Sequence, residues 1–417
     1  MKLGSLVALG LFGLGLASRS QNQPVTLIIG GDTRGYLAPC GCTKPMSGGI
    51  RRMASAIAQI GRPEDRVVLF SGPLTGGVTR QDELKLEAQA EAFRSMRAIG
   101  VGLAEQDTRL GMGPLLSFSE LSGGRVVASS LRPSASNPFV ERIAKGPVLF
   151  GSISEGSMSM AAALREQHVT SESAIESLLE EAKQGSQVAI LNLDGSEQTA
   201  RNLAQKHPEL GAIIYRSTGS PPKSAIRVGN VWLLSPGEKG KYLLKVRVTN
   251  KGLSDYAPID LGPAFADDKA VGEIYHEYLK RVASENLLDK MVRRPSNPFA
   301  GSQACKDCHS REYRIWAESQ HSKALKTLEN DSHDRDPDCV GCHVVGLESQ
   351  GGFTSRRETP FLTDVGCESC HGPAKAHSAA PYTEKMPIVG EKSCQSCHVP
   401  EHSPGFDFKT YWEKIKH

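Results

Sequence analysis

The sequence lacks a strong excess of either charge. Its 49 Lys and Arg residues nearly balance 46 Asp and Glu residues, which leaves a formal net charge of +3 over 417 residues. A net charge this small says little about partners and gives no ground for nucleic-acid binding. We therefore predict no nucleic-acid partner.

Long apolar runs are also scarce, because none after the N-terminus is long enough to span a membrane. The run at residues 3–17 follows Met1 and Lys2 and leads into small and then polar residues. At about 15 residues it is shorter than the roughly 20 of a transmembrane helix, and its pattern is typical of a secretory signal peptide. We predict a signal peptide at residues 1–20 and a periplasmic or otherwise exported protein. An uncleaved leader is the alternative, and it keeps peripheral membrane association open.

Eight of the ten cysteines form four C-x-x-C-H motifs within residues 305–398. This spacing lets two thiols form thioethers with one porphyrin and places the adjacent histidine under the iron. We therefore predict four covalently bound haem c groups. The predicted attachment residues are Cys305, Cys308, Cys339, Cys342, Cys367, Cys370, Cys394 and Cys397, and the predicted proximal ligands are His309, His343, His371 and His398.

Zinc is the alternative explanation of the cysteines. Two zinc ribbons could be built from paired C-x-x-C motifs. They would not require a histidine after every pair, whereas haem attachment does. The repeated histidine favours haem. Haem c is attached outside the cytoplasm, which agrees with the predicted export.

The region from residue 24 to 262 alternates short apolar runs with helical periods, which predicts a layered α/β domain. Expected strands cover 25–29, 67–70, 125–128, 148–151, 188–193 and 212–215, with 231–234 and 242–248 as a hairpin. Expected helices cover 84–99, 171–183 and 197–206. The fold class is thus an α/β layered sandwich, followed by a mainly α or irregular multihaem domain.

Residues 263–298 are predicted to form a helical linker, with an apolar stripe along the helix and a break where Pro295 and Pro298 follow two arginines. The haem domain then covers 299–417. A segment this short builds little apolar core of its own. We expect the porphyrins to act as its core and to lie close enough together for electron transfer.

The N-terminal region resembles the 5'-nucleotidase and calcineurin-like metallophosphoesterase family. Asp32-Thr33-Arg34-Gly35 is similar to that family's opening motif, and the segments at 70–72, 99–107, 190–194 and 215–219 keep its order. The resemblance implies a site for two metal ions, which needs several histidines and aspartates.

The expected metal-binding residues are missing from this region. Arg34 stands at a histidine position, Ser71 stands at an aspartate position, and only His168 and His207 occur between residues 24 and 262. Arginine and serine cannot replace imidazole as ligands of a transition metal. We predict an inactive scaffold.

Cys40 and Cys42 remain outside the haem motifs. A strained disulfide, a redox-active pair, a soft-metal site and two plain thiols all stay open for them.

The C-terminal domain resembles the cytochrome c-554 family of tetrahaem cytochromes. The likeness rests on the first three motifs together with the residues between them, including Trp316, His321, the Gly-Gly-Phe at 351–353 and His377. It implies an electron carrier that exchanges electrons with protein partners, a donor and an acceptor.

Further histidines in this domain are candidates for the distal axial positions. We expect a helix at 310–328 with His321 on one broad face, too far along it to serve the haem of His309. His377 matches a distal ligand of the family. His402 or His417 is expected to serve the haem of His398, unless that haem is five-coordinate, and His333 is expected to be solvated.

In that family the second haem lacks a distal ligand from the protein. The haem on His343 could then bind a small nitrogen or sulfur compound, so a haem enzyme is the first alternative to an electron carrier. A metal-dependent phosphoesterase with a haem tail is the second alternative, and the missing histidines argue against it.

Overall fold

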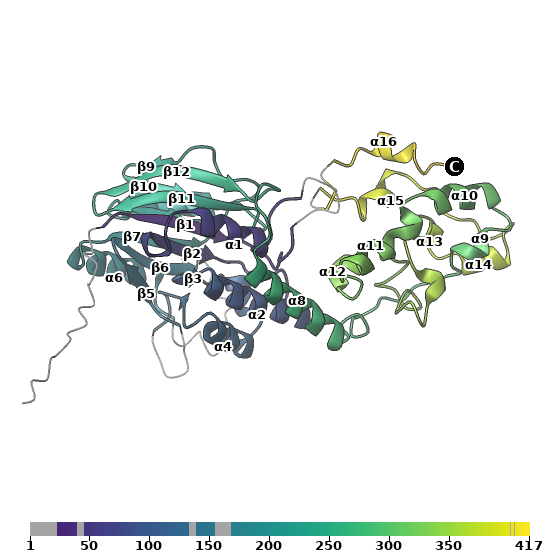
Figure 1. The fold of residues 1–417 in the computed structure, drawn as a ribbon, viewed down its shortest axis with the longest axis horizontal. Helices are drawn as coiled ribbons and strands as arrows, with labels where there is room; N and C mark the ends of the chain where they lie inside the picture. The colour runs from purple at the N-terminus through teal and green to yellow at the C-terminus, as the bar shows by residue number, and fades with distance from the viewer. Residues whose placement is uncertain (1–22, 40–45, 133–138, 155–167, 401, 404) are drawn as a thin grey trace, which may run out of the picture.

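Two lobes joined by one long helix make up the protein (Figure 1). The computed structural model describes residues 23–39, 46–132, 139–154, 168–400, 402–403 and 405–417. The predicted signal peptide, Cys40 and Cys42 lie outside these residues. Within the described ranges, no helix has the length and apolar character needed to cross a membrane.

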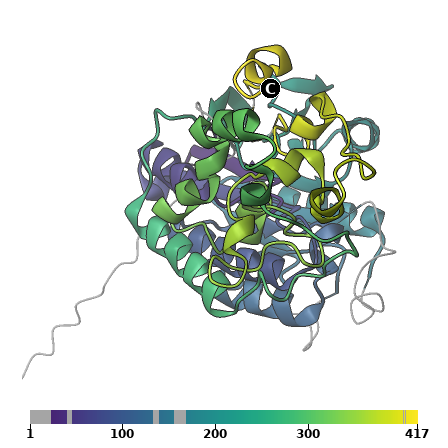
Figure 2. The ribbon, with the colours of Figure 1, turned by 90° about the vertical axis from the view of Figure 1, so that its right-hand side faces the viewer.

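The N-terminal lobe contains two six-stranded mixed sheets, which Figure 2 shows from the haem-domain end. The first has the order β12-β11-β1-β2-β3-β4, with bounds Gly252–Asp260, Tyr242–Thr249, Val25–Gly31, Arg66–Ser71, Gly100–Gly102 and Val126–Val127. The second has the order β5-β6-β7-β8-β10-β9, with bounds Arg142–Lys145, Val148–Ser154, Val188–Asp194, Ala212–Ile214, Val231–Leu234 and Ile226–Val228.

The central strands are apolar on both faces because each sheet is covered on both sides. β1 and β2 pair in parallel, with Leu27 opposite Val67 and Ile29 opposite Leu69. These four side chains are fully buried in one cluster with Phe150 of the second sheet. A continuous apolar run in a strand is the pattern expected for a sheet buried on two faces.

Helices complete the outer layers of the sandwich. α1 (Ile50–Gln59), α2 (Arg80–Ser95), α4 (Met112–Leu121) and α8 (Lys269–Ser284) share a core with the first sheet, and α6 (Ser171–Gln184) and α7 (Glu197–Lys206) share one with the second. The short α3 (Glu105–Thr108) precedes α4. The predicted α/β layered sandwich is therefore confirmed.

The predicted hairpin of residues 231–234 and 242–248 is wrong. β10 pairs with β8 and β9 in the second sheet, whereas β11 pairs with β1 and β12 in the first. The connecting loop contains two glycines with positive φ, Gly237 and Gly240, and carries the chain from one sheet to the other. The hairpin partner of β11 is β12, which the sequence patterns did not predict.

The C-terminal domain consists of short helices joined by irregular segments, as its predicted class requires. Their bounds are α9 Ser302–Cys305, α10 Ser310–Glu318, α11 Ala324–Asn330, α12 Pro337–Val340, α13 Cys367–His371, α14 Lys375–Ala379, α15 Glu391–Gln395 and α16 Phe408–Trp412. The single helix predicted at 310–328 is wrong. It breaks at Ser319, whose backbone is extended and whose hydroxyl donates to the carbonyl of Trp316.

The apolar core of this domain is small. It gathers nine buried side chains between Leu288 and Leu362. Among the described residues after Ala374 no apolar side chain is buried, and Tyr382 and Ile388 are almost fully exposed. A domain with so little core of its own fits the expectation that porphyrins supply the missing apolar interior.

Candidate haem sites and the buried carboxylates of the N-terminal lobe

The four C-x-x-C-H motifs lie on short helical turns of the C-terminal domain. The third motif is the whole of α13, and the second begins in α12 with Cys339. Among the described residues, the eight motif cysteines form no disulfide. A helical turn brings both thiols of a motif to one side of the histidine, which is the arrangement that attachment to one porphyrin needs.

Three motif histidines each face a second histidine. The ring centroids of His309 and His377 lie 6.3 Å apart, and those of His371 and His417 lie 5.9 Å apart. His398 faces His321 at 6.2 Å. His321, rather than His402 or His417, therefore lies beside the fourth motif.

This spacing fits an iron held between two imidazoles. A metal–imidazole bond is about 2 Å long, and a ring with bonds of about 1.33 Å has its centroid about 1.1 Å from each atom. Two imidazoles on opposite sides of one iron should then have centroids about 6.2 Å apart. The three observed separations, 6.3, 5.9 and 6.2 Å, agree closely with that value.

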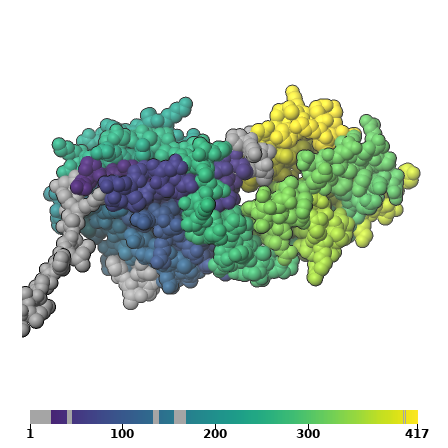
Figure 3. All heavy atoms as spheres, in the orientation of Figure 1, coloured from purple at the N-terminus to yellow at the C-terminus, as the bar shows by residue number. Residues whose placement is uncertain are grey.

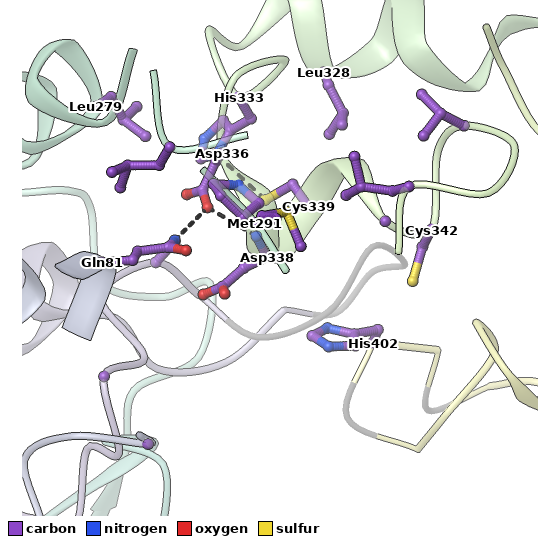
Figure 4. A pocket seen from close by; sticks show the side chains of 18 of the residues that line it. Gln81, Leu279, Met291, Leu328, His333, Asp336, Asp338, Cys339, Cys342 and His402 are labelled. Carbon is purple, nitrogen blue, oxygen red and sulfur yellow. Dashed lines mark hydrogen bonds between the residues drawn. The ribbon is translucent and has the colours of Figure 1, made fainter. Parts of the chain in front are cut away.

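His343 is placed differently from the other motif histidines. Its Nδ1 lies 2.7 Å from the carbonyl oxygen of Ala324, which leaves Nε2 available for iron. Within the described part of the chain, no histidine ring contacts its ring at the spacing of the other three pairs. His402 instead lines a cavity together with Cys339 and Cys342 (Figure 4).

Burial favours the neutral form of several of these imidazoles. Burial lowers the pKa of His398, and it also lowers the pKa of His321, where neighbouring His398 adds to the effect. Burial likewise lowers the pKa of His371. The neutral ring is the form that binds a metal ion.

The motifs lie close together through their sulfur atoms. Cys305 and Cys367 are within hydrogen-bond reach of each other, and so are Cys342 and Cys397. The helix of the third motif, α13, contacts α9 of the first motif and α15 of the fourth. The attachment points therefore follow one another through space in the order first, third, fourth and second motif.

Glu368, inside the third motif, connects these segments and was not identified from the sequence. It is buried, and its carboxylate accepts hydrogen bonds from the backbone N–H groups of Ala300, Gly301 and Ala374 at 2.8, 2.7 and 2.6 Å. It thereby ties the chain just before the first motif to the third. The sequence holds no local signal for this role because all three donors are backbone groups.

The structure also differs from the expectation for His333. It is half-buried rather than solvated, because the segment after α11 folds against the N-terminal lobe. Its Nδ1 lies 3.5 Å from the hydroxyl of Tyr275 and 3.7 Å from the Cys339 sulfur.

In the N-terminal lobe, the residues that resemble a two-metal site lie at the carboxyl ends of the sheet strands. Asp32 follows β1 and is buried, and its carboxylate receives Arg34 Nε at 2.7 Å and Nη2 at 3.2 Å. Asp194 ends β7, and Arg216 Nε lies 3.1 Å from its Oδ1. Each carboxylate therefore has a guanidinium where the resemblance implies a metal ion.

These residues do not fit a pair of metal ions. Burial raises the pKa of Asp32 while Arg34 lowers it, so the arginine offsets part of the cost of a buried carboxylate. Asp107 is also buried, and its carboxylate accepts the backbone N–H groups of Leu74, Thr75 and Ala104. Among the described residues, the single cluster with metal-ligand spacing contains Cys339 and lies in the other lobe.

The motifs and the histidine pairs make the C-terminal domain similar to c-type cytochromes. Residues 304–372 match the sequence model of the family "Cytochrome c554 and c-prime". Cytochrome c-554 of Nitrosomonas europaea is 38% identical over 93 residues, which cover 19% of this chain and 40% of that protein. The C-terminal domain thus resembles the cytochrome c-554 family, and the match spans less than half the length of this relative.

Solved structures resemble the N-terminal part. The NAD nucleotidase of Haemophilus influenzae has a TM-score of 0.54 at 12% identity, over 68% of this chain and 64% of that one. A 5'-nucleotidase precursor from Thermus thermophilus has a TM-score of 0.54 at 16% identity, over 82% and 74%. The N-terminal lobe therefore has the fold of 5'-nucleotidases.

Proposed function

We propose that the protein is an exported tetrahaem cytochrome that relays electrons between protein partners. The likeness to cytochrome c-554 supports a haem c electron-transfer domain. The observation that carries the proposal is the set of three histidine pairs at the spacing of axial ligands. Iron held by two imidazoles can change oxidation state without binding a substrate.

The axial ligands follow from these pairs. His377 serves the haem of His309, His417 serves that of His371, and His321 serves that of His398. When bound, the haems supply the electron-carrying irons, and the protein holds and orients their ligands.

The contacts among the motif cysteines support one order for the proposed relay. The haems follow one another as the groups at Cys305, Cys367, Cys394 and Cys339. A donor protein and an acceptor protein exchange electrons with this series.

The N-terminal lobe, in this proposal, has lost phosphoesterase activity. Arg34 and Arg216 neutralise the carboxylates of Asp32 and Asp194, which removes the anionic ligands that two metal ions need. Adding Mn²⁺ to the purified protein should neither raise its melting temperature nor produce hydrolysis of a nucleotide. Metal-dependent hydrolysis would contradict this part of the proposal.

A second function is supported by one observation at His343. Its ring lies against no other histidine ring in the described residues, and the cysteines of its motif line a cavity. An iron with one open position can bind a small ligand. The haem at Cys339 and Cys342 is therefore a candidate site for a small nitrogen or sulfur compound.

A haem count combined with low-temperature EPR tests both functions. We expect four haems per chain, three with low-spin ferric iron and one with high-spin iron. Four low-spin haems would agree with the electron relay and would contradict the proposed ligand-binding function. Fewer than four haems would contradict the tetrahaem proposal itself.

A further inference from the structure

A cavity of about 1900 Å³ lies between the two lobes and borders the second haem motif, and it also reaches Cys397 of the fourth motif and Glu368 of the third. Figure 3 shows the hollow between the lobes, and Figure 4 shows Cys342 and His402 on one side of the cavity. Cys339 and Cys342 line the cavity, whereas His343 does not. A porphyrin attached to those sulfurs would therefore extend into the cavity.

The N-terminal lobe supplies much of the opposite wall. Arg34, Tyr36, Gln81 and Lys85 line the cavity from that lobe. Arg34, which pairs with the buried Asp32, thus lies on the same cavity as Cys339 and Cys342. The N-terminal lobe thus faces the second haem motif. Within the described ranges, the histidine of that motif, His343, has no second histidine ring opposite it.

Buried polar contacts fix the two lobes at this place. Gln81 of α2 donates from Nε2 to Asp336 Oδ1 at 2.7 Å and to the hydroxyl of Tyr278 at 2.9 Å (Figure 4). Asp336 is buried and caps α12, the helix that carries Cys339. Lys85 of α2 pairs with Asp338 in the same helix. Because a buried group without its partner is costly, these contacts hold α12 against α2.

We propose that the N-terminal lobe forms one wall of the ligand pocket of the haem at Cys339 and Cys342, so that a small uncharged molecule reaches its iron only through the cleft between the lobes. This inference rests on the open haem proposed above. In this arrangement the inactive lobe limits the size and charge of what binds the iron.

The charged side chains that line the cavity are balanced in sign. Seven Lys and Arg side chains line the cavity, and so do seven Asp and Glu side chains. The propionates of a bound haem add further negative charge. An anion therefore gains no net attraction from the pocket, whereas an uncharged ligand such as nitric oxide does not need one.

Tyr36 offers a direct test because its half-buried ring lines the cavity from the N-terminal lobe. Carbon monoxide binding to the dithionite-reduced protein is followed after flash photolysis. We expect Tyr36→Ala to speed binding several-fold and Tyr36→Trp to slow it several-fold. Gln81→Ala should also speed it, because α12 loses its contact with α2.

Gln198→Ala is the matched control, because Gln198 is an exposed glutamine on α7 whose amide bonds locally, to Asn202. It should bind carbon monoxide at the parent rate. Each variant must keep the parent haem count and visible spectrum, which excludes misfolding as the cause of a changed rate.

The outcomes separate this inference from the proposed function. If carbon monoxide binds at the same rate to the parent and to both Tyr36 variants, the proposal that the N-terminal lobe forms a wall of the pocket is wrong. The proposal of an open haem would still stand. A parent that binds no carbon monoxide and shows only low-spin iron would overturn the open haem and the pocket together.

Discussion

Replacing Arg34 by alanine should destabilise the N-terminal lobe at neutral pH. The substitution leaves the carboxylate of Asp32, which is 2% exposed, without its bidentate partner. Removing one member of a buried ion pair costs about 3–5 kcal/mol. Arg34 is 36% exposed, so water screens part of the interaction, and we expect a loss of about 2–3 kcal/mol. For a domain of this size that corresponds to a decrease of about 4–12 °C in melting temperature.

The loss should depend on pH. Burial raises the pKa of Asp32 above its ordinary 3.8, and Arg34 opposes that rise. Without Arg34 the folded-state pKa of Asp32 rises further, so the folded variant holds its proton more tightly than the unfolded chain does. The variant therefore loses stability as the pH rises from the unfolded value through the folded pKa, and its deficit shrinks in acid.

Urea unfolding followed by tryptophan fluorescence measures this effect, because Trp232 is the only tryptophan between residues 24 and 262. Asp32→Asn combined with Arg34→Ala is the control, since a neutral amide needs no cation and should recover most of the loss. A deficit that stays constant between pH 4 and pH 8, or no deficit at neutral pH, would refute the view that the guanidinium takes the place of a metal ion.

Three further predictions concern single contacts. His377→Ala should convert the haem of His309 to high-spin iron, seen as an added high-spin EPR signal with an unchanged haem count; an unchanged spectrum would refute the pairing. Glu368→Ala should abolish stable folding of the haem domain, because three hydrogen bonds to a charged group are each worth about 1.5–3 kcal/mol; full haem incorporation at the parent level would speak against this. Thr79→Ala removes the capping box at the start of α2 and should cost about 1 kcal/mol in urea unfolding, whereas Thr79→Ser should cost little.

The sequence predicted those parts of the fold that depend on local pattern. Buried strands such as β1 and β2 are continuous apolar runs, and α7 has the bounds that its helical period predicted. The start of α1 lacks a capping side chain, because it follows Gly49 in a conformation that favours glycine. No local signal therefore marked this helix.

Contacts between distant segments could not be predicted in the same way. The histidine next to His398 was expected near the C-terminus, but His321 lies there instead. The choice between two histidines depends on how short helices fold around each other, and one-dimensional spacing does not contain that information. Likewise Gln81 and Asp336 are 255 residues apart, and nothing near either one indicates a shared interface.

The order of the haem motifs in space gives the proposed relay two unlike ends. α9, with the first motif, lies at the end of the molecule remote from the N-terminal lobe, while α12, with the second motif, lies against it (Figure 1). A redox protein can approach the first motif directly, but the N-terminal lobe covers one side of the second motif. In the proposed relay, exchange of electrons with large protein partners would therefore take place at one end of the haem series, and binding of a molecule of a few atoms at the other.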